Sequence, residues 1–181
     1  MLSHENRVRD EFTRQTETFS ASSAITDAGL TQRFVTALGE AARGSVLDVA
    51  CDPGILSAAI AKTAREVVAF DLTPQMLKKA KQRCSEAGLP NVSFLEGNAT
   101  ELPFVNGAFD AVVTRLSVHH FDRPSRVMSE IYRVLRRVGH FVIADVISSE
   151  VPAEAQLQNA IEILRDPPMC GCCRLPSCQR W

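Results

Sequence analysis

The feature of this sequence that most constrains its fold is an alternation of strand-like and helix-like runs that begins at Ser45. Five short runs rich in β-branched and aromatic residues are expected to be strands, and they cover residues 45–50, 66–71, 91–97, 109–117 and 139–146. Helix-like runs between them cover residues 55–64, 75–88 and 122–136, and Tyr132 in the last run is expected in the core. Strands that alternate with helices form a parallel sheet covered on both faces. The sequence therefore predicts an α/β fold, a three-layer Rossmann-like sandwich.

Helical patterns flank the alternating region on both sides. The residues expected in these helices are 6–20, 31–42 and 153–165. Thr26 or Asp27 is expected to cap the second of them, and Gly44 to end it. We therefore expect three segments, which are an N-terminal helical lid at 1–40, a central cofactor-binding domain at 41–147, and a helix with an irregular Cys-rich tail at 148–181.

Composition and charge exclude several classes of protein. The net charge is -1, so there is no electrostatic case for nucleic acid or a membrane surface as a partner. No apolar run approaches the roughly 20 residues of a membrane span, and the polar N-terminus does not resemble a secretory signal. A cytoplasmic protein is expected.

The six cysteines are unevenly placed. Cys51 and Cys84 lie in the body of the chain, and the tail holds the other four, Cys170, Cys172, Cys173 and Cys178. Disulfide frameworks spread their cysteines through a small secreted domain, and the spacing in the tail is not a standard zinc pattern. We expect neither a disulfide framework nor a metal site.

The residues that end the strands are the candidates for ligand binding, because ligands of open parallel sheets lie outside the carboxyl ends of the strands. Asp71 ends the second strand about 20 residues after the first turn, where an acid can accept hydrogen bonds from both hydroxyls of a ribose. A short polar side chain after the third strand, Asn98, could meet the edge of an adenine ring. These positions predict a nucleoside cofactor.

A dinucleotide is disfavoured. Its site needs Gly-x-Gly-x-x-Gly so that a pyrophosphate can approach backbone amides, whereas the first turn lacks two of these glycines and carries Asp52. A nicotinamide- or flavin-dependent enzyme is therefore only an outside alternative.

Five motifs, taken together and in order, carry a family resemblance over about residues 8–165. They are VLDVACDPG, VVAFDLTPQML, FLEGNATELPF, FDAVVTRLSVHHF and IYRVLRRVGHFVIADV. With them the chain resembles the class I S-adenosylmethionine-dependent methyltransferases, type 11, and within these the small-molecule branch that includes the ubiquinone and menaquinone biosynthesis enzymes. The resemblance implies strand order 3-2-1-4-5, S-adenosylmethionine as cofactor and methyl transfer to a small-molecule substrate.

The resemblance also implies roles for individual residues. The first loop would wrap the methionine part of the cofactor, Asp71 would bind the ribose, Leu72 would pack on adenine, and Asn98 would stand where relatives usually show Asp. The full set of implied cofactor-binding residues is Asp48, Ala50, Cys51, Asp52, Gly54, Asp71, Leu72, Gly97, Asn98, Ala99, Thr114 and Arg115. Gln15 and Phe19 of the N-terminal segment would belong to the lid and help to form the substrate pocket.

A sulfonium is an activated methyl donor, so placing the acceptor in line supplies much of the catalysis. A base is needed only when the acceptor atom arrives protonated, and His119 and His120 are the candidates. Simpler readings stay open: loop histidines satisfied by backbone, Asp71 as a helix cap, and Arg115 as a paired surface arginine.

The sequence departs from the family at several positions. Relatives carry glycine where this chain has Ala50, a mild change, and Asp52, which adds a Cβ and a charge near the cofactor carboxylate. Arg137-Val138 replaces a Pro-Gly turn, which we expect to be strained or remodelled. The alternative function is therefore a catalytically impaired or inactive methyltransferase-fold protein that binds its cofactor weakly.

Family members continue with further strands where this chain has its Cys-rich tail. Codons for residues 168–178, read one base earlier, admit SHVRMLPASEL, which resembles the family's continuation, so we hypothesise a shifted reading frame that the gene's nucleotide sequence would test. The fifth strand would then be an unprotected edge, through which a homodimer is possible.

Overall fold

The structure is a computed structural model that describes residues 4–22 and 26–165. The Cys-rich tail and its hypothesised frame shift lie outside these residues. The strands are β1 Ser45–Val49, β2 Glu66–Asp71, β3 Val92–Glu96, β4 Phe109–Arg115 and β5 Leu135–Ala144. They form one parallel sheet in the order β3-β2-β1-β4-β5, so the predicted α/β class and strand order are confirmed.

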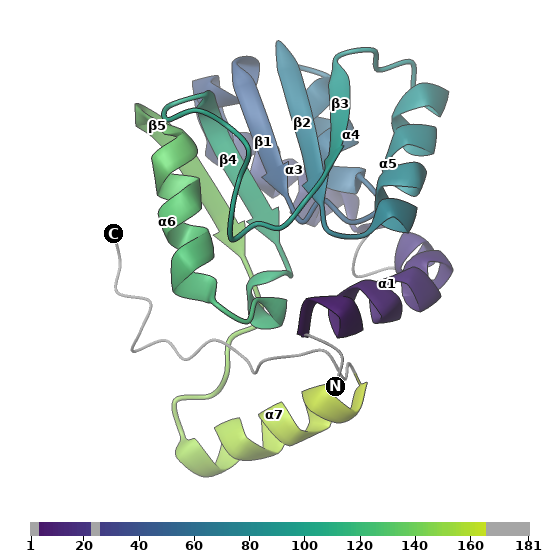
Figure 1. The fold of residues 1–181 in the computed structure, drawn as a ribbon, viewed down its shortest axis with the longest axis vertical. Coiled ribbons are helices and arrows are strands. Elements are labelled where there is room, and N and C mark those ends of the chain that lie inside the picture. The colour runs from purple at the N-terminus through teal and green to yellow at the C-terminus, as the bar shows by residue number, and fades with distance from the viewer. Residues whose placement is uncertain (1–3, 23–25, 166–181) are drawn as a thin grey trace.

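Helices cover both faces of this sheet (Figure 1). The helical elements are α1 His4–Ala21, α3 Ala28–Leu38, η1 Gly39–Arg43, α4 Ile55–Ala61, α5 Pro74–Glu86, η2 Val118–His120, α6 Pro124–Val134 and α7 Pro152–Arg165. Helices α3, α4 and α5 lie on one face, and α6 lies on the other. None of the helices within the described ranges has both the length and the apolar character that a membrane span requires.

The core lies on both faces of the three central strands. On one face, Phe34 and Leu38 of α3 pack with α4 and with alternate residues of β1, β2 and β4. On the other face, Val127 and Ile131 of α6 pack with the intervening strand residues and with Phe109. The side chains of a strand alternate between faces, so the apolar runs of β1 and β4 fill two cores at once.

Local signals explain both boundaries of α3. The Asp27 carboxylate accepts a hydrogen bond from the Leu30 N–H at 2.8 Å and caps α3. That helix ends at Leu38, before the predicted stop, because Gly39 adopts a left-handed backbone with φ 56° and the chain continues as the short η1.

The region from α6 to β5 differs from the prediction at Tyr132 and is remodelled at Arg137-Val138. Tyr132 is 83% exposed, so its expected place in the core is wrong. Its neighbour Ile131 faces the sheet, and one residue further along a helix points about 100° away. The turn expected to be remodelled at Arg137-Val138 is part of β5, whose register with β4 shifts between Phe109 and Ala111.

Strand β5 is the outermost strand at its end of the described sheet (Figure 1). Val138 and Ile143 on this strand are 87% and 44% exposed. Pairing of this edge with a second copy stays a prediction.

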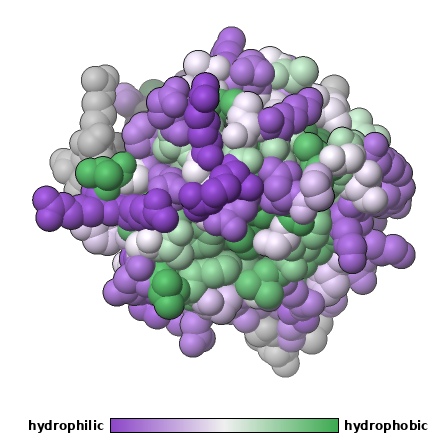
Figure 2. All heavy atoms as spheres, turned by 90° about the horizontal axis from the view of Figure 1, so that it is seen from above, coloured by the Kyte–Doolittle hydropathy of each residue, from purple (hydrophilic) through white to green (hydrophobic). Residues whose placement is uncertain are grey.

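The strands all end on the side of the sheet that α1 crosses (Figure 1). On the opposite side, where the strands begin, hydrophilic side chains surround an apolar area (Figure 2). The candidate functional site lies on the α1 side.

Candidate functional site

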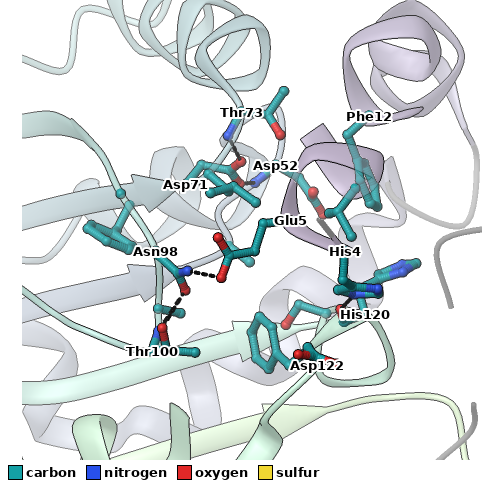
Figure 3. Close-up of a pocket in the computed structure, with 18 of the residues that line it drawn as sticks. His4, Glu5, Phe12, Asp52, Asp71, Thr73, Asn98, Thr100, His120 and Asp122 are labelled. Atoms are coloured by element: carbon teal, nitrogen blue, oxygen red, sulfur yellow. Dashed lines mark hydrogen bonds between the residues drawn. The ribbon is translucent and has the colours of Figure 1, made fainter. Parts of the chain in front are cut away.

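A cavity opens between α1 and the carboxyl ends of the strands (Figure 3). Its walls come from the segments that follow β1, β2, β3 and β4 and from the first turns of α1. The sheet order reverses between β1 and β4, which is where open parallel sheets bind ligands. The space, counted together with the solvent at its open mouth, is about 760 Å³.

The loop after β1 holds three left-handed residues in five positions. Ala50, Asp52 and Gly54 have φ values of 53°, 51° and 74°. Glycine adopts this backbone freely, Asp tolerates it, and Ala does so at a cost. The loop therefore keeps a glycine-type shape, and the change to Ala50, expected to be mild, leaves a strained residue.

Ala50 and Asp52 line the cavity, whereas Cys51 and Gly54 lie outside the lining. The Cys51 N–H donates to the Phe70 carbonyl at 3.1 Å, and burial raises the pKa of its thiol. A Cβ on Gly54 would come within 2.5 Å of the Ala80 Cβ, so this glycine permits close packing of α4 on α5.

Asp71 is the acid at the end of β2, and it lines the cavity although only 5% of it is exposed. One carboxylate oxygen accepts the Asp52 N–H at 3.0 Å, and the other accepts the Thr73 N–H at 2.8 Å. Burial raises the pKa of this carboxyl to about 6, against the lowering effect of these backbone hydrogen bonds. Because Thr73 is the N-cap residue of α5, Asp71 is not the helix cap of the simpler reading.

Asp48 lies beneath the loop and outside the cavity lining. Its carboxylate is 1% exposed and accepts a hydrogen bond from the Ser57 hydroxyl. Burial raises the pKa of Asp48 to about 7, while the Ser57 hydrogen bond and the charge of Arg115 act in the opposite direction. Asp48 therefore joins the end of β1 to α4 through Ser57 and does not face the cavity.

Leu72, directly after β2, and Gly97, Asn98 and Ala99, directly after β3, line the cavity. A Cβ on Gly97 would come within 2.6 Å of the Phe70 ring, so the absence of a side chain at Gly97 lets the wall pack on β2. The Asn98 side chain points toward the cavity and is hydrogen-bonded to Glu5 of α1 (Figure 3).

Thr114 and Arg115 end β4 but lie outside the cavity lining, whose next members along the chain are Leu116 and Ser117. The Thr114 hydroxyl donates to the Val49 carbonyl at 2.9 Å and is hydrogen-bonded to the Ser117 hydroxyl. Arg115 is 9% exposed, so it is not a surface arginine. Thr114 thus ties the end of β4 to the end of β1, across the point where the sheet order reverses.

The two histidines have different surroundings. His120 lines the cavity, and its ring meets the Phe12 ring edge to face at 4.9 Å. His119 is outside the lining, and its ring is 4.0 Å from that of His120 between centroids. Its Nδ1 is hydrogen-bonded to Asp145, which also accepts the Val118 N–H at 2.6 Å.

Burial would raise the pKa of Asp145, but hydrogen bonds from His119 and from backbone N–H groups outweigh it and lower that pKa. Asp145 lies outside the residues predicted for the site. Its position directly after β5, at the same sheet edge as the other strand ends, is a signal that would have found it.

Helix α1 closes the cavity with residues from its first three turns. His4, Glu5, Val8 and Phe12 line the cavity, whereas Gln15 and Phe19 do not. The spacing of Val8 and Phe12 was visible in the sequence, but the helix begins two residues before the predicted start and so adds His4 and Glu5.

The donor set of this cavity fits a nucleoside. The Asp71 carboxylate lines the cavity and accepts backbone N–H groups, and a ribose hydroxyl is a donor that such an acceptor can bind. The apolar side chain of Leu72 and the segment from Gly97 to Ala99 lie beside it, where a base would extend from the ribose. The described residues hold no cluster of three side chains suited to a metal ion.

Comparisons with known proteins agree with this geometry. Residues 47–143, more than half of the 181-residue chain, match a family model described as a methyltransferase domain. YcgJ of Bacillus subtilis, an uncharacterized methyltransferase, is 33% identical over 122 residues, which cover 67% of this chain and 48% of that protein. The demethylmenaquinone methyltransferase of Renibacterium salmoninarum is 32% identical over 131 residues, 70% of this chain and 53% of that protein.

The crystal structure of YcgJ is also similar, with a TM-score of 0.79 at 29% identity over 82% of this chain and 64% of that one. The chain spans about half the length of the curated relatives it matches.

Proposed function

The chain belongs to the methyltransferase domain family, and from this premise we propose that it transfers a methyl group from S-adenosylmethionine to a small-molecule acceptor. The observation that carries the proposal is the Asp71 carboxylate, which lies buried at the end of β2 and lines the cavity as a hydrogen-bond acceptor. Bound S-adenosylmethionine would supply an activated methyl group on its sulfonium.

Four groups of residues hold the cofactor in this proposal. Asp71 accepts the ribose hydroxyls, and Leu72 and Ala99 cover the adenine. The left-handed loop at Ala50 and Asp52 surrounds the methionine part. Asp48, Cys51, Gly54 and Thr114 keep the shape of this wall from outside the lining, which supports a positioning role for them.

The histidines provide the proton chemistry of the proposal. His120 lines the cavity and would take a proton from an acceptor atom that arrives protonated. His119 packs on His120, and Asp145 fixes its ring through Nδ1. Asp145 is therefore a positioning residue behind the pair.

A small-molecule acceptor fits the partly closed cavity, in which α1 supplies Val8 and Phe12 as apolar lining. One relative is a demethylmenaquinone methyltransferase, which supports a substrate with an apolar ring system.

Calorimetric titration with S-adenosylhomocysteine at pH 8 tests the proposal. We expect a dissociation constant in the micromolar range, and loss of at least about tenfold in affinity for Asp71→Asn, because hydrogen bonds to a charged group are worth about 1.5–3 kcal/mol. At pH 5 the wild-type affinity should fall roughly tenfold, because the Asp71 carboxyl with a pKa of about 6 is then mostly neutral.

The Asp71→Asn variant should lack this pH dependence and serves as its control. Folded wild-type protein that binds no S-adenosylhomocysteine at millimolar concentration would refute the proposed function.

A further inference from the structure

Glu5, in the first turn of α1, places its carboxylate in the cavity. Glu5 points between Asp71 and Asn98, and its Oε1 accepts a hydrogen bond from Asn98 Nδ2 at 2.6 Å (Figure 3). Because residues 5 and 98 are 93 positions apart, this contact depends on how α1 lies across the sheet.

Several contacts fix α1 in this position. His4 Nε2 is 2.8 Å from the His120 carbonyl oxygen, and Thr13 donates to Gln75 of α5 at 3.2 Å. Two ion pairs add to these, joining Arg9 to Glu96 at 3.2 Å and Lys79 to Glu17 at 2.7 Å. Glu5 is therefore held over the end of β3.

The orientation of the Asn98 amide is determined by Thr100. Both the Thr100 N–H and the Thr100 hydroxyl donate to Asn98 Oδ1, each at 2.9 Å. An N–H can only donate, so the atom that it meets is the amide oxygen. The other end of the amide, its NH₂ group, therefore faces the cavity and Glu5.

This orientation is the wrong polarity for the amino group of adenine, because two donors would face each other. An aspartate in the place of Asn98 could accept the Thr100 groups with one oxygen and an amino group with the other. In this chain the NH₂ group of Asn98 donates to the Glu5 carboxylate, which has a second oxygen besides the one that Asn98 uses.

We propose that Glu5 of α1 is the residue that recognises the exocyclic amino group of the cofactor's adenine, in place of the side chain at the end of β3. The inference rests on the proposed function, since it assumes a nucleoside whose ribose is held by Asp71. It makes α1 part of the cofactor site and ties specificity for a 6-aminopurine to closure of this helix.

Calorimetric titration with two ligands tests the inference. The ligands are S-adenosylhomocysteine and S-inosylhomocysteine, in which an oxo group replaces the 6-amino group. We expect Glu5→Ala to weaken binding of the adenosyl ligand about fivefold, the worth of one ordinary hydrogen bond, because Glu5 is exposed to solvent. Binding of the inosyl ligand should be unchanged or tighter, because its oxo group can accept from Asn98 directly.

Two further variants sharpen the test. Glu11→Ala removes a carboxylate of the same helix that lies outside the cavity lining and bonds to Arg14 and Gln15 of α1, and it should leave both affinities unchanged. Glu5→Ala combined with Asn98→Asp should recover the affinity for the adenosyl ligand, because the new carboxylate supplies the missing acceptor.

The outcomes separate this inference from the proposed function. Equal effects of Glu5→Ala on both ligands, or tighter binding of the adenosyl ligand, would overturn the role of Glu5 while leaving the cofactor site in place. Wild-type protein that binds neither ligand would overturn both.

Discussion

The aspartate in the loop after β1 offers the sharpest test of what limits the affinity of this cavity for the proposed cofactor. Asp52 lines the cavity with a left-handed backbone, and its N–H donates to Asp71. Replacing it with glycine changes two things at once, because it relieves the backbone and removes a carboxylate from a cavity that already holds Asp71. The two effects act on different observables.

The backbone effect concerns stability. A left-handed backbone costs about 1–2 kcal/mol for an ordinary residue and less for Asp. Glycine removes this cost, but it also destabilises the folded state by about 0.4–1 kcal/mol, because the unfolded chain gains conformational freedom. Asp52→Gly should therefore change the free energy of unfolding by less than about 1 kcal/mol, and the N–H bond to Asp71 remains available in the variant.

The charge effect concerns affinity. A carboxylate about 4–6 Å from the cofactor's own carboxylate costs about 0.7–4 kcal/mol for effective dielectric constants between 80 and 20. Since about 1.4 kcal/mol is tenfold in affinity, both Asp52→Gly and Asp52→Asn should tighten binding of S-adenosylhomocysteine by at least roughly threefold. The gain should shrink between low and high salt, because Asp52 is only partly buried and its charge is screened.

A neighbouring residue provides a matched control for the backbone. Ala50 has nearly the same φ, 53° against 51°, and carries no charge. Ala50→Gly should gain up to about 1 kcal/mol of stability in urea denaturation and change the affinity little. If Asp52→Asn binds no tighter than the wild type while Ala50→Gly does, the backbone limits binding and the charge argument is wrong.

Two buried carboxyls predict opposite pH effects on stability. The pKa of Asp48 is raised to about 7, so the folded state holds the extra proton and stability falls as pH rises from about 4 to 7. The unfolding free energy of Asp48→Asn relative to wild type should therefore increase by up to about 4 kcal/mol over this range, and equal curves in urea denaturation would contradict it. The pKa of Asp145 is lowered, so its contribution is present above its unfolded value and lost as pH falls. Asp145→Asn should cost about 1.5–3 kcal/mol at pH 7, and this deficit should narrow below about pH 4; a deficit independent of pH would contradict the assignment.

The sheet was predictable because a short apolar run in the sequence marks each of its strands. The apolar runs at β1 and β4 are buried on both faces, and the Pro at the start of α5 marks a helix start directly. Tyr132 was misplaced for a reason that local patterns do not resolve. Residues 131 and 132 are both apolar enough for a core, and only the sheet determines which of them faces it.

The candidate site likewise contains residues that the sequence could predict and contacts that it could not. Asp71 and Asn98 could be found because the carboxyl ends of parallel strands meet at one edge, whatever the side chains do. The ring pair of His119 and His120 could be proposed from its place after β4, but not its partner Asp145. Contacts between residues far apart in the chain, such as Glu5 with Asn98, depend on how a helix lies across the sheet, and no spacing in the sequence encodes that.

The departures from the family pattern share one physical property. Ala50 and Asp52 keep the left-handed backbone that glycine would adopt, and Asn98 keeps the hydrogen bonds to Thr100 that an aspartate would accept. In each case the shape of the wall is preserved, but the charge changes at two of the positions, with one carboxylate gained at Asp52 near the methionine end and one lost at Asn98 near the adenine end. The Glu5 carboxylate takes the place of the one lost at the adenine end. The charge added by Asp52 lies in the cavity wall together with that of Asp71. We therefore expect the departures to change how tightly the cavity holds a nucleoside, and to leave the fold that forms it intact.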